Sequence, residues 1–478
     1  MPDKRLSPSD AMFLYAESRE QMMHVAGLLE FTPAADTRPD HLRGLMDEIR
    51  AGTQPVERPW NTKLRTPDLL WNPLQAWVPE PDTDLEYHVR RSALPSPGDE
   101  RELGILVSRL HGVAVDFHRP PWEAHLIEGL EHDRFAFYVK VHHSLVDGFS
   151  AMRMLINALS TDPTERDRPL FFAVPPPARP PRPEPAPTTD DGVYFPELLA
   201  AVREQYGASK SVWRALMNVV KSEDHKLVSP RQAPKCILNA RISRSRRFAT
   251  MKLPTARLRA VAKAANGTLN DAILALSAGS LRRYLLEQDA LPKEPLIAML
   301  PVAIRGARIA RPEEPKARTR EGDGDEGGGN AVGAILASLA TDLPDPVERL
   351  HTIVASTSNA KQQLQGMSKA AILQYSALLT APSMLQMIPM TAGHVRPTFN
   401  VVISNVPGPD EPLYFRGARL DASYPMSIPV HGQAVNITCN SYAGSVCFGF
   451  TGCRDTVPHL QRLALHTREA LAEIEAAL

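Results

Sequence analysis

Two adjacent histidines, followed by an aspartate and a glycine, are the residues of this sequence best suited to chemistry. They form the string HHSLVDG, in which His142 and His143 precede Asp147 and Gly148. A histidine titrates near neutral pH, so a rigidly held one can take a proton from a hydroxyl, an amine or a thiol. Two other interpretations stay open, a pair of hydrogen-bonded core histidines and a metal site. The metal site is the weaker of these, because adjacent strand residues point to opposite faces and no other His/Cys cluster has ligand spacing.

The segment before the motif predicts which way each histidine points. Residues 134–143 alternate between apolar and other residues, as in a β-strand whose two faces differ. His143 then ends an apolar face, and His142 lies on the opposite face with Tyr138 and Lys140. The residues that share the face of His143 are Phe135, Phe137, Val139 and Val141. A histidine in this position is partly desolvated, which suits a general base.

Asp147 and Gly148 are predicted to turn the chain into a helix at 149–160. We expect the Asp147 carboxylate to hold this loop, through a cation or backbone N–H groups, rather than to move protons. The sequence has no GxSxG elbow, no P-loop and no HExxH string. Without a clear covalent nucleophile, His143 would activate a hydroxyl, amine or thiol of the substrate itself.

Strands and helices are mixed in both halves of the chain. In the first half we expect a strand at 24–31, helices at 40–51 and 99–111, and a hairpin formed by 122–130 and 134–143. In the second half we expect strands at 247–253 and 295–304, helices at 255–265 and 269–288, a helical region at about 346–379, strands within 400–408 and 435–450, and a final helix from Pro458. This order indicates an α/β (α+β sandwich) architecture that is used twice.

Proline is unevenly distributed and predicts the domain boundaries. The chain has 44 prolines in 478 residues, nearly twice the usual ~5%. Ten of them lie within 163–187, a composition that favours a stiff polyproline II linker. We expect an N-terminal domain at 1–172, a linker at 173–190 and a C-terminal domain at 191–478. Within the last, the charged and glycine-rich segment 311–330 is predicted to be a disordered loop.

Composition argues against several classes of protein. Lys+Arg and Asp+Glu are both 54, so no basic excess is available for nucleic acid. No signal-peptide core follows the N-terminus, no window of 18 apolar residues occurs, and four cysteines are too few for a disulfide scaffold. We expect a cytoplasmic protein, and contact with a membrane or lipid surface stays open. A basic run is either a solvated face or a contact for acidic lipid or CoA, and its members are Arg241, Arg244, Arg246 and Arg247.

HHSLVDG resembles the active-site motif of the CoA-dependent acyltransferase superfamily, which includes chloramphenicol acetyltransferase, carnitine acyltransferases and peptide-synthetase condensation domains. Other blocks are similar to those of the bacterial wax ester synthase/diacylglycerol acyltransferase family, and they occur in the family's order. These blocks are LSPSDAMFLYAE, PPWEAHLIEGL, TLNDAILALSAGSLRRYL, NVVISNVPGP and YPMSIPVHGQAVNITCNSYAG. Together they cover nearly the whole chain.

The resemblance implies two chloramphenicol-acetyltransferase-like domains, each a mixed sheet with helices, that face each other across a cleft or tunnel. The reaction it implies moves a fatty acyl group from acyl-CoA to a long-chain alcohol, giving a wax ester, or to diacylglycerol, giving triacylglycerol. His143 would be the general base of a ternary complex without an acyl-enzyme. No cofactor is expected, because acyl-CoA is a substrate.

Two of the family-like blocks supply further candidate site residues. Asp271 follows Thr268 by three residues, a capping-box spacing, so Asn270 and Asp271 either begin a helix or act at the site. Ser404 and Asn405 precede a Pro-Gly turn, which explains most of their pattern. One of them could still donate a hydrogen bond to the thioester or to an oxyanion.

In the PPW block, Pro120 and Trp122 flank Pro121, where the family usually has leucine. If this segment is only a rigid turn, the change should be mild. If the leucine lines a substrate channel, specificity would change. Trp122 is either a core residue or a substrate contact. By analogy with superfamily members, Asp147 could pair with an arginine of the other half, and Arg305 is the candidate.

Two other functions stay open. One is acyl transfer to a different acceptor, such as a polyketide or a glycolipid. The other is a non-catalytic lipid-binding role, against which the intact His143 argues.

Overall fold

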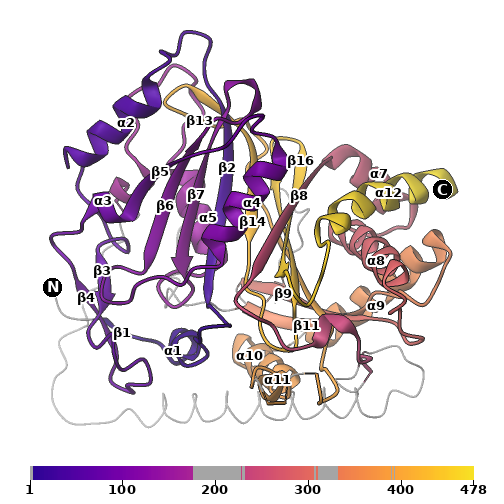
Figure 1. Ribbon diagram of the computed structural model, residues 1–478. Coiled ribbons are helices and arrows are strands. Elements are labelled where there is room, and N and C mark those ends of the chain that lie inside the picture. The colour runs from indigo at the N-terminus through magenta and orange to yellow at the C-terminus, as the bar shows by residue number, and fades with distance from the viewer. Residues whose placement is uncertain are drawn as a thin grey trace, which may run out of the picture.

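The computed structural model describes residues 4–175, 228, 232–305, 308–309, 332–365, 367–388, 390–391 and 393–478. The loop expected at 311–330 and most of the linker expected at 173–190 lie outside these residues. Two large β-sheets, a small sheet and their covering helices make up the described part (Figure 1). This arrangement confirms the predicted α/β fold class.

A six-stranded sheet carries the histidine motif. Its strand order is β13-β14-β2-β7-β6-β5. The hairpin predicted from the alternating segments is confirmed, since β6 (Trp122–Glu128) pairs antiparallel with β7 (Phe135–His142). On its other side β7 pairs with β2 (His24–Thr32), and β5 (Val89–Ala93) lies parallel to β6. β7 is therefore a central strand, which holds the residues at its end firmly.

Helices cover both faces of this sheet. On one face, Leu28 and Tyr138 belong to the same apolar cluster as residues of α4 (Glu100–His111). On the other face, Leu29 and Phe137 belong to a cluster with residues of α2 (His41–Arg50) and α5 (Gly148–Asn157). The strict alternation along β2 and β7 produces these two separate cores.

A seven-stranded sheet forms the second half, in the order β10-β9-β12-β15-β16-β8, with β11 also paired to β9. Its strands are β8 (Arg246–Pro254), β9 (Ile297–Arg305), β10 (Arg308–Ile309), β11 (Val332–Ser338), β12 (Val401–Val406), β15 (Val435–Tyr442) and β16 (Ser445–Cys453). β12 lies parallel to both β9 and β15, so the sheet is mixed.

Helices of the second half pack on one face of this sheet and share its large apolar core. They are α7 (Thr255–Ala264), α8 (Leu269–Glu287), α9 (Pro346–Leu364), α10 (Lys369–Thr380) and α12 (Gln461–Ala477). The short α11 (Ser383–Gln386) follows α10, and none of its described residues belongs to this core. The helical region expected at 346–379 consists of two helices, because α9 ends at an extended Gln365 and Ser368 caps α10. The opposite face of the sheet is turned toward the first half (Figure 1).

One strand of the first sheet comes from the second half of the chain. β14 (Ala418–Met426) pairs antiparallel with β2, and the short β13 (Tyr414–Phe415) extends it. The sequence pattern did not predict this strand. The sheet that ends at the histidine motif is thus built from residues 24–142 together with residues 414–426.

Direct hydrogen bonds join the two halves close to the motif. The Gln21 side-chain oxygen accepts the His431 N–H at 2.9 Å, and the Arg246 guanidinium donates to the Glu20 carbonyl at 2.6 Å. Arg246 is 5% exposed, whereas Arg241 makes an ion pair with the Glu20 carboxylate at the surface. The basic run is therefore not a uniformly solvated face, since Arg246 is a buried contact between the halves.

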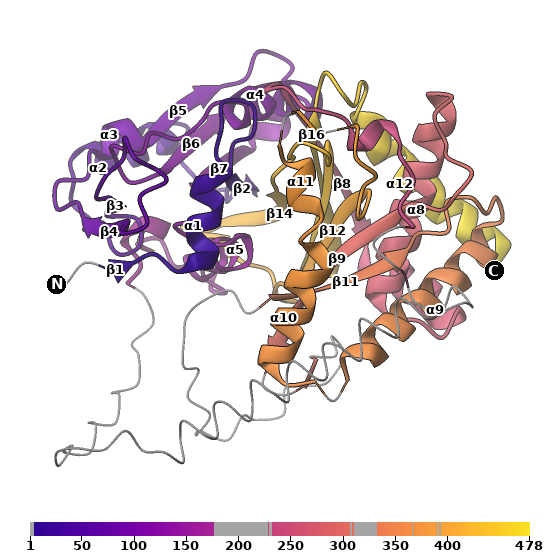
Figure 2. The ribbon, with the colours of Figure 1, turned by 90° about the horizontal axis from the view of Figure 1, so that it is seen from below.

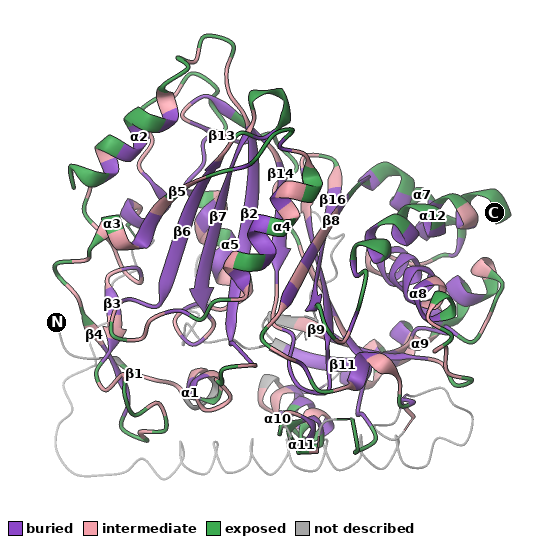
Figure 3. Cartoon of the chain, viewed as in Figure 1, coloured by how far each residue is buried: buried purple, intermediate pink, exposed green. Residues whose placement is uncertain are grey.

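A small sheet lies beside the first half, formed by β1 (Lys4–Arg5), β4 (Ala76–Pro79) and β3 (Thr62–Leu64). Helix α1 (Pro8–Tyr15) follows β1, and the Ser7 side chain caps it. Figure 2 shows α1, α10 and α11 together on the underside of the molecule. In Figure 3 the strands of both large sheets are mostly buried, and α2 and α7 expose their outer sides. Within the described residues, no helix is both long and apolar enough to cross a membrane.

Candidate active site

His143 directly follows β7 and is held on three sides. Its ring stacks on the ring of Phe13, with centroids 3.9 Å apart and an angle of 19° between the planes. Its backbone N–H donates to the Met23 carbonyl at 2.9 Å. The apolar face of β7 lies behind it, as the alternation predicted. The residue is partly exposed to solvent, whereas its Nδ1 is buried and has no hydrogen-bond partner among the described residues.

The charge state of His143 follows from this packing. Burial lowers the pKa of His143 to about 4, although the Asp147 carboxylate opposes the change. The imidazole is therefore neutral at neutral pH and has a lone pair available. A neutral, oriented imidazole is the form that a general base needs.

His142 lies on the opposite side of the strand and is fully buried. Its Nδ1 is 2.6 Å from the Ser144 hydroxyl and accepts the Ser144 N–H at 3.2 Å. Its Nε2 is 3.4 Å from a carboxylate oxygen of Glu17, and Phe117 packs edge-on against the ring. With both nitrogens engaged, His142 fits the interpretation as a hydrogen-bonded core histidine rather than a role as a second catalytic histidine.

Asp147 is the N-cap of α5. Its two carboxylate oxygens accept the Ser150 N–H at 2.9 Å and the Ser150 hydroxyl at 2.6 Å. This is one of the two forms of loop support expected, the one that uses backbone N–H groups. Arg305 is the last residue of β9, but its side chain lies outside the described residues. Gly148 begins α5, where an added Cβ would meet only Val25 at an ordinary 3.8 Å.

The PPW block touches the motif through its backbone. The Pro121 carbonyl accepts the His142 N–H at 2.9 Å, and the Pro120 carbonyl accepts the Trp122 N–H at 2.8 Å. Trp122 is 1% exposed, and its indole N–H donates to the Trp60 carbonyl at 2.7 Å. The block therefore forms a turn next to the histidines, with its tryptophan in the core.

Asp271 has a complete structural role. It forms a capping box with Thr268 at the start of α8, and it accepts the Thr357 hydroxyl of α9 at 2.7 Å. Asn270, in the same helical turn, is partly buried. The pair thus lies at the start of a helix that packs on the helical side of the second sheet.

Ser404 and Asn405 lie on opposite faces of β12, because they are adjacent in a strand. Ser404 pairs in register with Thr438 and shares the sheet face that is turned toward the first half. Asn405 shares the other face with Ile403 and Cys439, both members of the helix-side core. Its amide oxygen is buried and has no hydrogen-bond partner among the described residues. Of the two, only Ser404 is on the side of the sheet where His143 lies.

The sequence pattern did not single out Phe13, Glu17 and Met23, the residues that contact the two histidines from the α1–β2 segment. All three lie in or just after the family-like block LSPSDAMFLYAE. Phe13 belongs to α1, whereas Glu17 lies just beyond the end of this helix. Their place in or next to this family-like block was the available signal.

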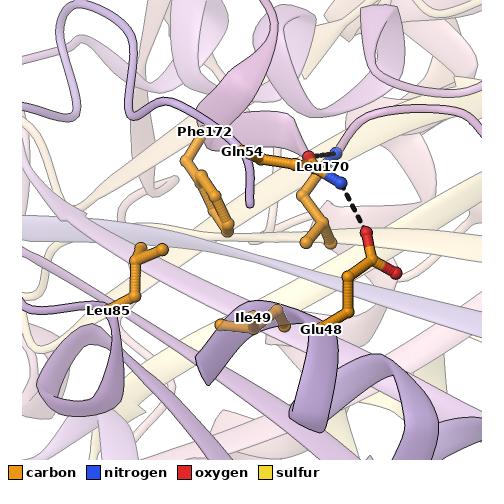
Figure 4. Close-up of a pocket in the computed structure, with 6 residues that line it drawn as sticks. All are labelled: Glu48, Ile49, Gln54, Leu85, Leu170 and Phe172. Atoms are coloured by element: carbon orange, nitrogen blue, oxygen red, sulfur yellow. Dashed lines mark hydrogen bonds between the residues drawn. The ribbon is translucent and has the colours of Figure 1, made fainter. Parts of the chain in front are cut away.

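A separate narrow crevice, too tight to hold a water molecule, lies in the first half (Figure 4). It is lined by Glu48, Ile49, Gln54, Leu85, Leu170 and Phe172. Its polar groups are already bonded, since Gln54 donates to Glu48 at 2.6 Å and accepts the Leu170 N–H at 3.0 Å. It offers no free group for acyl transfer. Among the residues that the structure describes, no group of three or more His, Cys, Asp or Glu side chains is arranged to hold a metal ion.

Comparison with known proteins gives a consistent match. Residues 6–273 match the model of the wax ester synthase/diacylglycerol acyltransferase catalytic domain, and residues 328–475 match the WS/DGAT C-terminal domain. A Mycobacterium tuberculosis (strain H37Rv) protein, provisionally named a diacylglycerol O-acyltransferase, is 49% identical over 99% of this chain and 97% of its own length. O-acyltransferase WSD of Acinetobacter baylyi is 38% identical over 99% and 97%.

Solved structures agree with these sequence matches. The wax ester synthase/diacylglycerol acyltransferase of Marinobacter aquaeolei VT8 superimposes with a TM-score of 0.74 at 37% identity, covering 99% of both chains. The first condensation domain of the calcium-dependent antibiotic synthetase gives a TM-score of 0.54 at 16% identity, over 99% of this chain and 96% of that domain. This second likeness concerns the fold alone.

Proposed function

This chain belongs to the wax ester synthase/diacylglycerol acyltransferase family and is an acyl-CoA-dependent O-acyltransferase, and we propose that His143 is its general base. The observation that carries the proposal is the state of this side chain. It is neutral at neutral pH, stacked on Phe13, held by its backbone at Met23 and still partly open to solvent.

In the proposed reaction, the His143 imidazole takes the proton of the acceptor hydroxyl while that oxygen attacks the thioester carbonyl. The new C–O bond gives a tetrahedral oxyanion, and its collapse breaks the C–S bond. The imidazolium then returns its proton to the CoA thiolate, so the histidine ends as it began. Both substrates are present together, no acyl-enzyme forms, and no cofactor takes part. Asp147 holds the loop through Ser150, and a hydroxyl such as that of Ser404 is a candidate donor to the oxyanion.

The acceptors that we propose are a long-chain fatty alcohol, giving a wax ester, and diacylglycerol, giving triacylglycerol. The names of the Marinobacter and Mycobacterium relatives include these two activities. A chain with a formal net charge of zero suits substrates that are largely hydrocarbon.

The test is release of free thiol from palmitoyl-CoA with hexadecanol or with diacylglycerol. His143→Ala should abolish release with both acceptors. His118→Ala is the matched control, because this histidine side chain is 61% exposed at the surface, and it should keep the normal rate. Near-normal turnover by His143→Ala would remove the general base from the mechanism. A wild-type chain that binds these lipids without thiol release would instead be a lipid-binding member of the family.

We also propose that the enzyme meets a lipid surface with the side shown in Figure 2. Several elements carry exposed large apolar side chains, namely α1, the β3–β4 loop and the segment around α10 and α11; these side chains are Met12, Leu69, Trp71, Leu74, Leu378, Met384, Ile388, Met390 and Val395. Trp71 is 68% exposed and stacks on Tyr15 of α1, the helix that also carries Phe13. Residues 349–409 contain no Asp or Glu, so this part of the surface does not repel anionic headgroups. Exposed apolar side chains on neighbouring elements support peripheral contact with lipid.

Vesicle flotation tests this surface. The double variant Trp71→Ser/Met390→Ser should bind less than the wild type to phosphatidylcholine vesicles that contain phosphatidylglycerol. The matched control is Leu286→Ser/Leu465→Ser, which removes two apolar side chains, each 50% exposed, from α8 and α12. Equal binding by both double variants would contradict the proposed surface.

A further inference from the structure

We infer that Glu17 is a positioning residue for the proposed reaction, because its single carboxylate holds both histidines of the motif through two separate hydrogen-bonded arms. The inference rests on His143 being the base. Glu17 follows α1, and its side chain is only 7% exposed. Burying a carboxylate costs free energy unless nearby groups bind it, so the contacts of Glu17 must offset this cost.

The first arm leads to His143 through one residue. A carboxylate oxygen of Glu17 accepts the Met23 N–H at 2.5 Å. The Met23 carbonyl in turn accepts the His143 N–H at 2.9 Å. Both bonds are made by the backbone of Met23, which directly precedes β2. A displacement of the Glu17 carboxylate would therefore also displace the backbone of His143.

The second arm leads to His142 and fixes its tautomer. The Ser144 N–H donates to Nδ1 of His142, so that nitrogen must offer a lone pair. The ring proton is therefore on Nε2, which lies 3.4 Å from the same oxygen of Glu17. The Ser144 hydroxyl, 2.6 Å from Nδ1, completes this chain. His142 is locked between the carboxylate and the turn that follows His143.

Buried cations from both large sheets surround the Glu17 carboxylate. Two buried cations, Lys140 and Arg246, interact electrostatically with Glu17, which raises the pKa of each against the lowering caused by burial. Lys140 belongs to the first sheet and Arg246 to β8 of the second. Arg246 also donates to the Glu20 carbonyl at 2.6 Å, which pins the same loop.

Two conservative variants separate positioning from charge. Glu17→Asp keeps the charge but shortens the side chain by one methylene, so the carboxylate cannot reach both donors. Glu17→Gln keeps the length and one acceptor oxygen but loses the charge. Since misplacing a reacting group by about 1 Å can cost on the order of 10²-fold in rate, we expect Glu17→Asp to lower kcat by about 10- to 100-fold. We expect Glu17→Gln to lose less than this, with KM for palmitoyl-CoA unchanged within about two-fold in both variants.

Glu20→Asp and Glu20→Gln are the matched controls. Glu20 is in the same loop, but its side chain is 38% exposed and pairs with Arg241 at the surface, so both variants should keep the wild-type kcat. A Glu17→Asp enzyme that is as fast as the wild type, or faster than Glu17→Gln, would overturn the inference. His143→Ala belongs in the same series. If His143→Ala stays active, the proposed base is wrong. If His143→Ala is inactive but Glu17→Asp keeps the wild-type kcat, only the role of Glu17 is overturned.

Discussion

Removing the Phe13 ring should move the acid limit of activity to higher pH. The ring lies 3.9 Å from His143 and shields one face of the imidazole from water. Burial is the main cause that lowers the pKa of His143, from the ordinary value of 6.5 to about 4. Phe13→Ala opens that face, so the charged form is better hydrated and the pKa must rise toward its ordinary value.

The size of the effect is bounded by these two values. The difference between 6.5 and about 4 sets an upper limit of about 2.5 pH units on the movement. At pH 6 a histidine with a pKa near 4 is about 99% neutral, whereas one restored to 6.5 is only about 24% neutral. The wild type should thus have a flat kcat/KM between pH 8 and about 5.5, while Phe13→Ala should lose activity within that range.

The assay is kcat/KM for palmitoyl-CoA with hexadecanol from pH 4.5 to 8 at constant ionic strength, because this ratio reports the pKa of the free enzyme. Thiol is detected with dithiodipyridine, which reacts in acid, and enzyme returned from each pH to pH 7.5 must recover its rate. Phe117→Ala is the matched control, since Phe117 packs on His142 with centroids 4.9 Å apart. A wild-type limit near pH 6.5, or identical limits for Phe13→Ala and the wild type, would refute the argument from burial.

Three other predictions concern stability and support of the loop. Below pH 6.5 the histidines of the unfolded chain bind protons, whereas the buried histidines of the folded chain stay neutral. The free energy of unfolding in urea should therefore fall by up to ~1.4 kcal/mol per pH unit for each such histidine. A free energy that stays constant from pH 6.5 to 4.5 would contradict this. Burial lowers the pKa of three of them to between about 3 and about 4, namely His88, His111 and His143, while Glu30, raised by burial to about 7, offsets one. Asp147→Asn keeps a side chain that can cap α5 and should retain kcat within about ten-fold, whereas a far larger loss would reveal a cationic partner. Trp122→Phe loses the indole hydrogen bond and should cost about 1–3 kcal/mol in urea unfolding without changing the preference between dodecanoyl-CoA and palmitoyl-CoA.

Local patterns predicted much of the fold around the motif. Alternation along β7 placed His143 and His142 on opposite faces, and the structure has them there because pleating follows directly from sequence order. The capping-box spacing at Asp271 likewise predicted a helix start, since both partners lie within one turn.

Contacts between distant segments were not predictable in this way. β14 contains Asp421, Pro425 and a register shift after Leu420, so it lacks a clean alternation, and its partner β2 is almost 400 residues earlier. Glu17 meets His142 across 125 positions. A single sequence carries no signal for such pairings, because nothing local distinguishes a glutamate that reaches a histidine from one that faces water.

The late strand β14 has a consequence for how the protein is made. β7 ends at residue 142, but β14 does not begin until residue 418. At about 5–20 residues per second, a ribosome needs roughly 14 to 55 s to cover that interval. Throughout it, the long and almost wholly buried strand β2 has one unpaired edge, which can join the same edge of another nascent chain. The yield of active enzyme in a cell should therefore depend more on how many unfinished chains are present at once, and so on the rate of expression, than on the free energy of unfolding of the finished protein.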